Sequence, residues 1–294
     1  YLGVQRFGEW DGVWEYVDGE VHRVAGTQGV SANAMLEDEQ GILWVGTSEG
    51  VLRLDNEFAV TYNMSDGLPS DLVTCLFEDS RGVLWIGTEG GGAACYDGGV
   101  FQTVRVPSNP ALNSVVSVSQ AVDDEIWFAT NGGVVRYRQK RVLPTVEMLQ
   151  VSADRDHLPR DGLQLPDTAG RVSISFRGLS RSVVSSDLVY RHRLVGLSDE
   201  WTQTRELEAE FVKLRPRNYR FELQAVDPDL NYSEVLAIDF DVTEDPRIGA
   251  LTAALSDARH GEFIGESEAL EEVRRQVREV GWTDLTVLIL GETG

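Results

Sequence analysis

The sequence contains little cysteine, little proline and few basic residues. Its 294 residues include 2 cysteines, 9 prolines, and 26 lysines and arginines against 48 aspartates and glutamates, which gives a formal net charge of −22. The two cysteines, Cys75 and Cys95, exclude a disulfide scaffold and lack metal or redox spacing. An acidic surface repels phosphate backbones, so we expect this segment to bind no nucleic acid directly.

Residues 244–262 also lack a long hydrophobic run. Their longest uncharged stretch, Ile248 to Ser256, is nine residues long. Spanning a bilayer takes about 20 apolar residues. We therefore predict a linker here rather than a membrane crossing, and a cytoplasmic location for the chain.

Glycine, by contrast, is plentiful, at 29 residues of 294. With so little proline, these glycines indicate frequent tight turns rather than low complexity. The 42% of hydrophobic residues is enough to build a core and excludes a disordered chain. At about 150 residues per domain, the length indicates two domains and a small third one.

The first half of the sequence repeats with a period near 41 residues. The repeated cores are Leu43–Thr47 (LWVGT), Leu84–Thr88 (LWIGT) and Ile126–Thr130 (IWFAT), with tryptophans at Trp44, Trp85 and Trp127. An acidic turn precedes each core, in a shortened form at Asp123–Glu125, and a glycine-led apolar strand follows each. A partial copy opens the chain at Gly12–Tyr16.

Units of this length, with about four short strands each, are typical of β-propeller blades. We predict a partial propeller over residues 1–143, with about three and a half blades. The three tryptophans are expected to pack between neighbouring blades. Because an open propeller exposes strand edges, further blades are expected before Tyr1, so the chain is interpreted as a piece of a longer protein.

The repeat resembles the two-component regulator propeller repeat of bacterial sensor proteins. The acidic turn, the tryptophan core and the glycine-led strand correspond over Ala34–Asp55 and Thr74–Asp97, and more loosely in a third unit. WD and kelch repeats use other residues at these positions. The resemblance implies a propeller that receives a signal from an unidentified ligand or protein.

Beyond Leu143 the repeat ends and alternating strands follow. Apolar and polar residues alternate in runs such as Tyr219–Ala225. This alternation indicates a sheet with one packed face and one solvent-exposed face. About seven such strands over 144–243 predict an immunoglobulin- or fibronectin-like β-sandwich.

The sandwich region resembles the Tyr-rich (Y-Y-Y) domain that follows such propellers. The segment Tyr190–Trp201 carries the resemblance, and Tyr219 and Phe221–Ala225 fit the later strands of that family. Phe211 stands where the family usually has another tyrosine. We predict that these aromatic side chains lie in the core or at strand corners rather than on a binding surface.

One short segment, Asp227–Asn231, has the opening spacing of a calcium loop. Its sixth position is Tyr232, where an EF-hand requires glycine. The segment also falls between two predicted strands, so we interpret it as a hairpin turn. The histidines lie far apart in sequence and are expected at the surface or in the core: His22, His157, His192 and His260.

The last 32 residues predict a helix, a buried strand and the start of a phosphate-binding turn. Ser267 can cap the helix and Gly281 can end it. The apolar strand Leu285–Leu290 then runs into the sequence Gly291-Glu292-Thr293-Gly294. A strand followed by such a turn begins the loop G-x-x-x-x-G-K-[ST], whose lysine would fall after Gly294.

Residues 263–294 resemble the start of the sigma-54 interaction (AAA+) domain of bacterial enhancer-binding activators. Phe263–Ser267 (FIGES), a helix and Asp284–Gly294 (DLTVLILGETG) occur there in this order. The resemblance implies that Gly291, Glu292, Thr293 and Gly294 begin an ATP loop, and that Ile264 and Gly265 border the adenine pocket. It also implies ATP and magnesium as cofactors of the full-length protein and sigma-54 RNA polymerase holoenzyme as its partner.

The chain is thus expected to be mainly β: a partial propeller, a sandwich, a linker and a truncated α/β start over 263–294. We interpret it as the sensor and transmitter of a sigma-54-dependent transcription regulator. Without the loop lysine, this segment is expected neither to bind ATP well nor to hydrolyse it. The alternatives are the sensor region of a hybrid two-component histidine kinase and a propeller enzyme such as a carbohydrate lyase.

Overall fold

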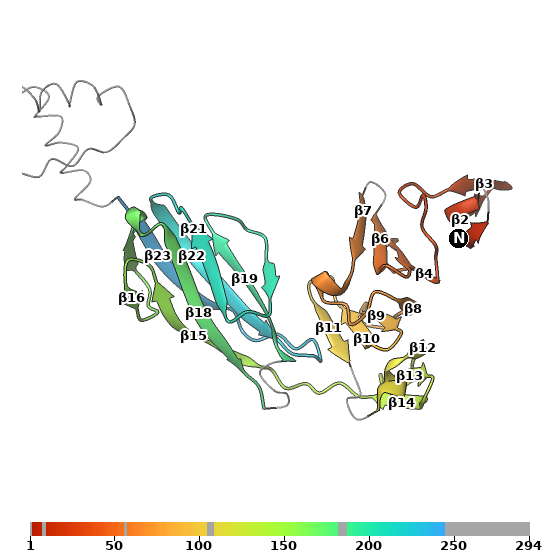
Figure 1. Ribbon diagram of the computed structural model, residues 1–294. Coiled ribbons are helices and arrows are strands. Elements are labelled where there is room, and N and C mark those ends of the chain that lie inside the picture. The colour runs from red at the N-terminus through yellow and green to blue at the C-terminus, as the bar shows by residue number, and fades with distance from the viewer. Residues whose placement is uncertain (1, 8–9, 56–57, 105–108, 182–186, 245–294) are drawn as a thin grey trace, which may run out of the picture.

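The fold was analysed in a computed structural model, which describes residues 2–7, 10–55, 58–104, 109–181 and 187–244. A row of small sheets lies on one side and a sandwich of two longer sheets on the other (Figure 1). The described residues are nearly all strands and turns, as predicted. Within them, no helix reaches the length and apolarity needed to cross a bilayer.

The row of sheets is a partial propeller with about three and a half blades, as the repeat predicted. The first sheet contains β1 (Leu2–Phe7), β2 (Trp10–Val17) and β3 (Glu20–Arg23). Two four-stranded blades follow, β4 (Ala34–Glu37) with β5 (Leu43–Gly46), β6 (Val51–Asp55) and β7 (Phe58–Tyr62), then β8 (Val73–Glu78) with β9 (Leu84–Thr88), β10 (Gly92–Tyr96) and β11 (Phe101–Val104). The third blade contains β12 (Val115–Gln120), β13 (Ile126–Thr130) and β14 (Gly133–Tyr137). Short 3-10 helices, η1 (Met64–Asp66) and η2 (Pro110–Asn113), connect the blades.

The second strand of each full blade is buried on both of its faces. Leu84 and Ile86 of β9 belong to one core cluster with Trp44 of the preceding blade. Trp85, which points to the opposite face, meets the rings of Phe128 and Tyr137 in the following blade, each with a centroid distance of 5.6 Å. Because successive side chains of one strand point to opposite faces, the strand packs its blade against both neighbouring blades.

Glycine in the repeated core permits this close approach. A Cβ atom at Gly46 would lie 2.5 Å from Cγ1 of Val73, and one at Gly87 would lie 2.9 Å from Cγ1 of Val115. Both valines begin the innermost strand of the next blade. The third blade has Ala129 at this position, which is exposed because no later blade covers it among the described residues.

The turn before the third repeat has the same length as the others. The backbone N–H of Ala121 donates to the carbonyl of Glu125 (2.8 Å), which closes the same turn that Asp79 closes in the second blade (3.0 Å). Asp124, at φ 62°, takes the left-handed conformation that glycine takes in the other two turns. The predicted shortened turn at Asp123–Glu125 is therefore wrong: alanine has replaced the aspartate, and no residue is missing.

The second region is a β-sandwich of nine strands rather than the seven expected. One sheet has the order β16 (Asp156–His157), β15 (Thr145–Ser152), β18 (Arg171–Leu179), β21 (Glu208–Val212). The other has the order β17 (Leu163–Pro166), β23 (Leu236–Thr243), β22 (Arg217–Val226), β19 (Val189–Val195), β20 (Thr202–Thr204). All pairs are antiparallel except β17 with β23, and η3 (Asp167–Ala169) joins β17 to β18. The short strands β16 and β20 carry too few residues to show alternation in the sequence.

Most aromatic residues of the Tyr-rich segment lie in the sandwich core. The hydroxyl of the buried Tyr190 accepts a hydrogen bond from the backbone N–H of Gly178 (2.8 Å). Tyr219 donates to the carbonyl of Arg215 (3.0 Å), four residues upstream, which is the geometry of a tyrosine corner. Trp201 differs: it is only half-buried and lies under the guanidinium of Arg191, 4.5 Å from its ring centroid.

The fold predicts a specific cost for filling the space at Gly87. Gly87→Ala should lower the opening free energy of the amides in β9 and β12 by about 1–3 kcal/mol, because the added methyl would come too close both to Sγ of Cys75 in its own blade and to Cγ1 of Val115 in the next blade. Ala129→Val is the matched change on the uncovered third blade. It should alter the opening free energy of the amides in its own strand, β13, by less than about 0.5 kcal/mol. Amide hydrogen exchange measures both, and equal effects would contradict the close-approach explanation.

Candidate functional site

The sandwich contacts the propeller through residues 227–232 (Figure 1). These residues form the first part of the connection from β22 to β23, and we call them the docking loop. The fully buried Asp227 sets its shape. Its carboxylate accepts hydrogen bonds from the backbone N–H groups of Asp229 (2.9 Å) and Asn231 (2.9 Å) and from the Asn231 side chain (3.0 Å). Burial raises the pKa of Asp227 despite these bonds. The turn predicted between two strands is thus present, and its first carboxylate binds the loop's own donors.

The docking loop reaches the second and third blades through polar contacts. The side chain of Asn231 donates to the carbonyl of Lys140 (2.6 Å), and the Tyr232 hydroxyl donates to Asp97 (2.6 Å). The Tyr137 hydroxyl, at the end of β14, donates to the carboxylate of Asp229. Burial, together with the neighbouring carboxylates, raises the pKa of both tyrosines, so both hydroxyls remain donors at neutral pH.

An apolar cluster and one buried amide complete the junction. Val100 of the propeller packs with Val189 and Val226 of the sandwich, and all three are buried. The Gln102 amide, which is 1% exposed, donates to the carbonyl of Val226 (2.8 Å). A buried amide without a partner would cost about 1–3 kcal/mol, so this bond fixes the register between the two regions.

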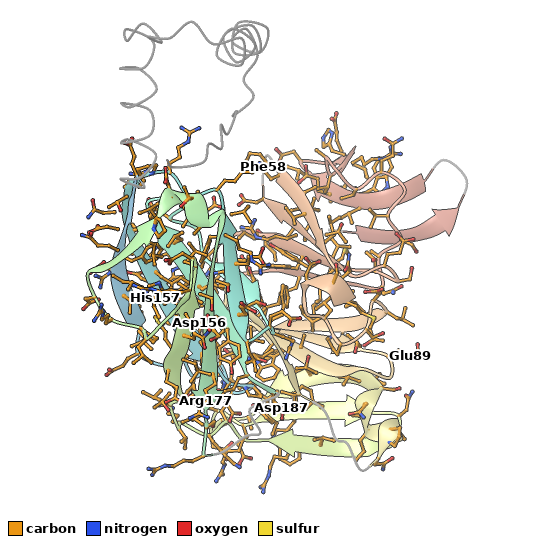
Figure 2. All side chains as sticks on the ribbon, turned by 60° about the vertical axis from the view of Figure 1, so that its left-hand side comes forward. Phe58, Glu89, Asp156, His157, Arg177 and Asp187 are labelled. Atoms are coloured by element: carbon orange, nitrogen blue, oxygen red, sulfur yellow. The ribbon has the colours of Figure 1, made fainter. Side chains whose placement is uncertain are left out.

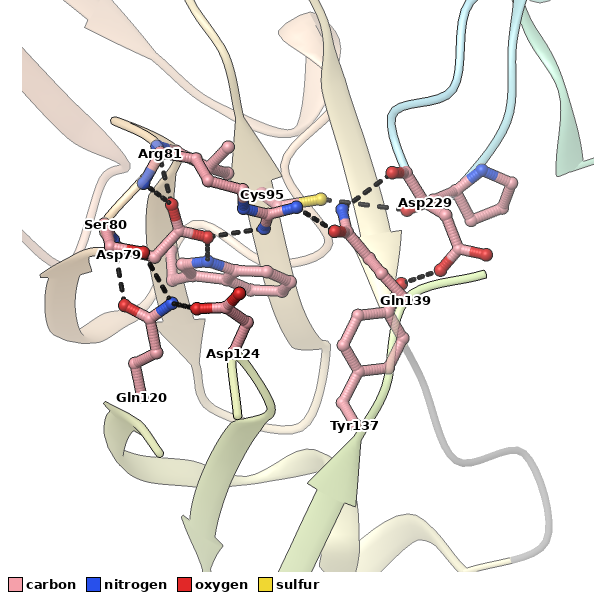
Figure 3. A network of polar contacts seen from close by, with 12 residues as sticks. Asp79, Ser80, Arg81, Cys95, Gln120, Asp124, Tyr137, Gln139 and Asp229 are labelled. Carbon is pink, nitrogen blue, oxygen red and sulfur yellow. Dashed lines mark hydrogen bonds and ion pairs between the residues drawn. The ribbon is translucent and has the colours of Figure 1, made fainter. Parts of the chain in front are cut away.

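A continuous polar network links the tryptophan motif of the second blade to the docking loop (Figure 3). Asp79 accepts from the Trp85 indole N–H (3.0 Å) and from the Arg81 guanidinium (2.6 Å). Arg81 donates to the side-chain oxygen of Gln139, whose amide nitrogen donates to the carbonyl of Asp229 (2.7 Å). The network therefore connects the docking loop with the core of a blade.

The charge of Asp79 holds this network together. Burial alone would raise the pKa of Asp79, but hydrogen bonds from Arg81, Trp85 and two backbone N–H groups outweigh burial, so the pKa is lowered. The first blade has the same bond between Asp38 and the Trp44 indole (2.8 Å). Aspartate precedes tryptophan by six residues in both blades, which is the sequence signal for this pair.

The three predicted motif tryptophans have different surroundings. Trp44 and Trp85 are 3% and 0% exposed and lie between neighbouring blades. Trp127 is 37% exposed, because Ala121 replaces the aspartate and no later blade covers this face among the described residues. The sequence pattern did not predict that Asp38 and Asp79 accept hydrogen bonds from the indole N–H groups of these tryptophans.

A cleft of about 750 Å³ opens beside the docking loop. Arg136, Arg138 and Lys140 line it from the propeller side, and Arg205 and Asp229 line it from the sandwich side. Asp187, another lining residue, lies at the boundary of the two regions, whereas Glu89 lies on the edge of the propeller turned away from the sandwich (Figure 2). The cleft therefore lies where the propeller and the sandwich are in contact, and residues of both regions line it.

The predicted nucleotide-site residues lie outside the described residues, as do the rest of the linker after Glu244 and the predicted helix. These are Ile264, Gly265, Gly291, Glu292, Thr293 and Gly294. Within the described part of the chain, no cluster of three or more His, Cys, Asp and Glu residues is placed to hold a metal ion.

Comparison with known families identifies the repeats. Residues 27–49 and 67–90 match the family described as "Two component regulator propeller". The two matched segments fall on the two four-stranded blades, where the sequence pattern is clearest.

A second comparison connects the chain with transcriptional activators. A stretch of 72 residues, 24% of this chain, is 44% identical to the formate hydrogenlyase transcriptional activators of Escherichia coli and Salmonella typhimurium. The chain spans about 10% of the length of these curated relatives.

Solved structures with a similar fold are distant in sequence. An extracellular domain assigned to a hybrid two component system from B. thetaiotaomicron is 20% identical, with a TM-score of 0.38, over 72% of this chain and 32% of that one. Virginiamycin B lyase from Staphylococcus aureus is 11% identical, with a TM-score of 0.30, over 68% of this chain and 82% of that one.

The lowered pKa of Asp79 makes the stability of the second blade depend on pH. Its contribution to stability is present above the ordinary value of 3.8 and is lost as the pH falls through the lower, folded value. Asp79→Asn should therefore lower the opening free energy of β9 amides by about 1–3 kcal/mol at neutral pH and by clearly less near about pH 3. Hydrogen exchange measures this difference, with the exposed Asp123→Asn as control; a difference that stays constant with pH would assign the loss to packing.

The docking loop holds the connection between β14 and β15 through the hydrogen bond from the Asn231 side chain to the carbonyl of Lys140 (2.6 Å). Asp227→Ala leaves two backbone N–H groups of the loop without their acceptor, so the loop should leave the propeller. Trypsin cleavage after Lys140 and Arg141 should become roughly tenfold faster, because cleavage follows the population of the open form. Asp161→Ala, which removes an exposed bond to the N–H of Asp239, is the control. Equal cleavage of the two variants would contradict a docking role for the loop.

Proposed function

We propose that this chain is the signal-receiving and transmitting region of a bacterial sigma-54-dependent transcription regulator. The observation that carries the proposal is the 44% identity over 72 residues to formate hydrogenlyase transcriptional activators. The two-component regulator propeller repeats support a sensory role for the first half of the chain. The Tyr-rich sandwich is the transmitter in this proposal.

The hairpin of β22 and β23 supplies a physical route for transmission. Its docking loop touches the propeller, and β23 ends on the side of the sandwich turned away from the propeller (Figure 1). Ten residues of β22 at about 3.3 Å each extend over roughly 33 Å. Because a hydrogen-bonded hairpin is stiff, a shift of the docking loop moves the point where the chain leaves the sandwich.

The next step of the proposal concerns the nucleotide. Gly291, Glu292, Thr293 and Gly294 would begin the ATP loop of the full-length protein, with Ile264 and Gly265 beside the adenine. ATP and magnesium would then drive remodelling of sigma-54 RNA polymerase holoenzyme.

We place the regulator in the cytoplasm, because the charged residues of 244–262 favour a linker within one compartment. The match to two-component regulator repeats favours a second candidate, the sensor region of a hybrid histidine kinase. The two candidates differ in their chemistry, since the kinase transfers the γ-phosphate of ATP to its own histidine.

The proposal makes a prediction for the full-length protein. Deleting residues 1–243 should change ATP turnover and sigma-54-dependent transcription severalfold, and Asp227→Ala should change both in the same direction, because each removes the input from the propeller. Asp161→Ala should leave both unchanged. If neither the deletion nor Asp227→Ala has an effect, the sensory role is lost; phosphorylation of a histidine without sigma-54 transcription would establish the kinase instead.

A further inference from the structure

The cleft beside the docking loop has a charge opposite to that of the chain. Its lining includes four basic side chains, Arg136, Arg138, Lys140 and Arg205, and two acidic ones, Asp187 and Asp229. The whole sequence has 48 acidic and 26 basic residues. A concave site with an excess of one sign of charge concentrates ions of the other sign, and more so where the surrounding surface repels them.

A buried carboxylate holds two of these guanidinium groups at the cleft wall. Glu125 has only 4% of its side chain exposed and accepts from Nε of Arg138 (2.7 Å). The same carboxylate lies 3.7 Å from Nε of Arg136. The guanidinium groups themselves are exposed, with side-chain values of 61% for Arg136 and 72% for Arg138. Glu125 therefore orients both cations, and its contacts leave the Nη1 group of Arg138 and both Nη groups of Arg136 as further donors.

The positive groups come from both sides of the junction. Arg136 and Arg138 belong to β14 and its continuation, Lys140 follows in the connection to the sandwich, and Arg205 follows β20. Guanidinium groups bind carboxylate and phosphate oxygens through paired N–H donors. A ligand with two such groups can therefore contact the propeller and the sandwich at once.

We propose that this cleft binds a small anion with two or more carboxylate or phosphate groups, which bridges the propeller and the sandwich. The inference rests on the proposed sensory function, because bridging would favour one arrangement of the docking loop next to the cleft. The volume of about 750 Å³ suits a small molecule rather than a polymer. The shared chemistry is the oxyanion, and the two probes below separate its carboxylate and phosphate forms.

Titration calorimetry of the purified chain with citrate and, separately, with pyrophosphate tests the proposal. We expect saturable binding of at least one probe, weakened about tenfold in Lys140→Gln and in Arg136→Gln, and weakened by salt between about 0.01 M and about 0.15 M. Arg171→Gln is the matched control, since Arg171 is a sandwich arginine with a similar exposure of 65%, and it should bind as the wild type does. Unchanged amide exchange outside the cleft would show that the variants are folded.

Two results would overturn the anion site: absence of saturable binding of both probes, or an equal loss in Arg171→Gln and in the cleft variants. The binding assay needs neither ATP nor polymerase, so its failure is separate from failure of the proposed function. Binding with no effect of the anion on the ATPase of the full-length protein would keep the site and remove its sensory role.

Discussion

The buried carboxylate of Asp227 is the interaction on which the joined structure depends. It removes a charge from water, which is costly, and the hydrogen bonds from the N–H groups of Asp229 and Asn231 offset part of that cost. The loop held in this way presents Asp229, Asn231 and Tyr232 to the propeller. Without that internal support, a short surface loop would not keep three side chains in register with two blades.

The blades apply the same principle at a smaller scale. In both four-stranded blades an aspartate accepts a hydrogen bond from the indole N–H of the tryptophan six residues later, and glycine two residues after the tryptophan admits the next blade. The third blade has Ala121 and Ala129 at these two positions, and its Trp127 is partly exposed. Both replacements occur where no following blade is present among the described residues. The aspartate and the glycine of the motif are therefore found where a blade packs against a following one.

The network from Asp79 through Arg81 and Gln139 to Asp229 joins these two levels. It connects the inside of a blade with the loop end of the β22–β23 hairpin, next to the cationic cleft. Hydrogen bonds in such a chain polarise and strengthen one another. The proposed sensory role would use this connection between the propeller and the sandwich.

The sequence alone determined the elements that depend on local pattern. The 41-residue period predicted the blades, strict alternation predicted the main sandwich strands, and the missing glycine at Tyr232 predicted a turn instead of a calcium loop. Short strands such as β16 were not predicted, because two or three residues show no alternation. The equivalence of Ala121 with Asp79 was not predicted either, because the two residues differ in chemistry although they close the same turn. Only the tertiary structure decided the site, since Tyr137 and Gln139 lie 92 and 90 residues before Asp229 along the chain and meet it through the packing of the sandwich on the propeller. Pattern is a property of neighbours in sequence, whereas a junction is made by residues that become neighbours only after folding.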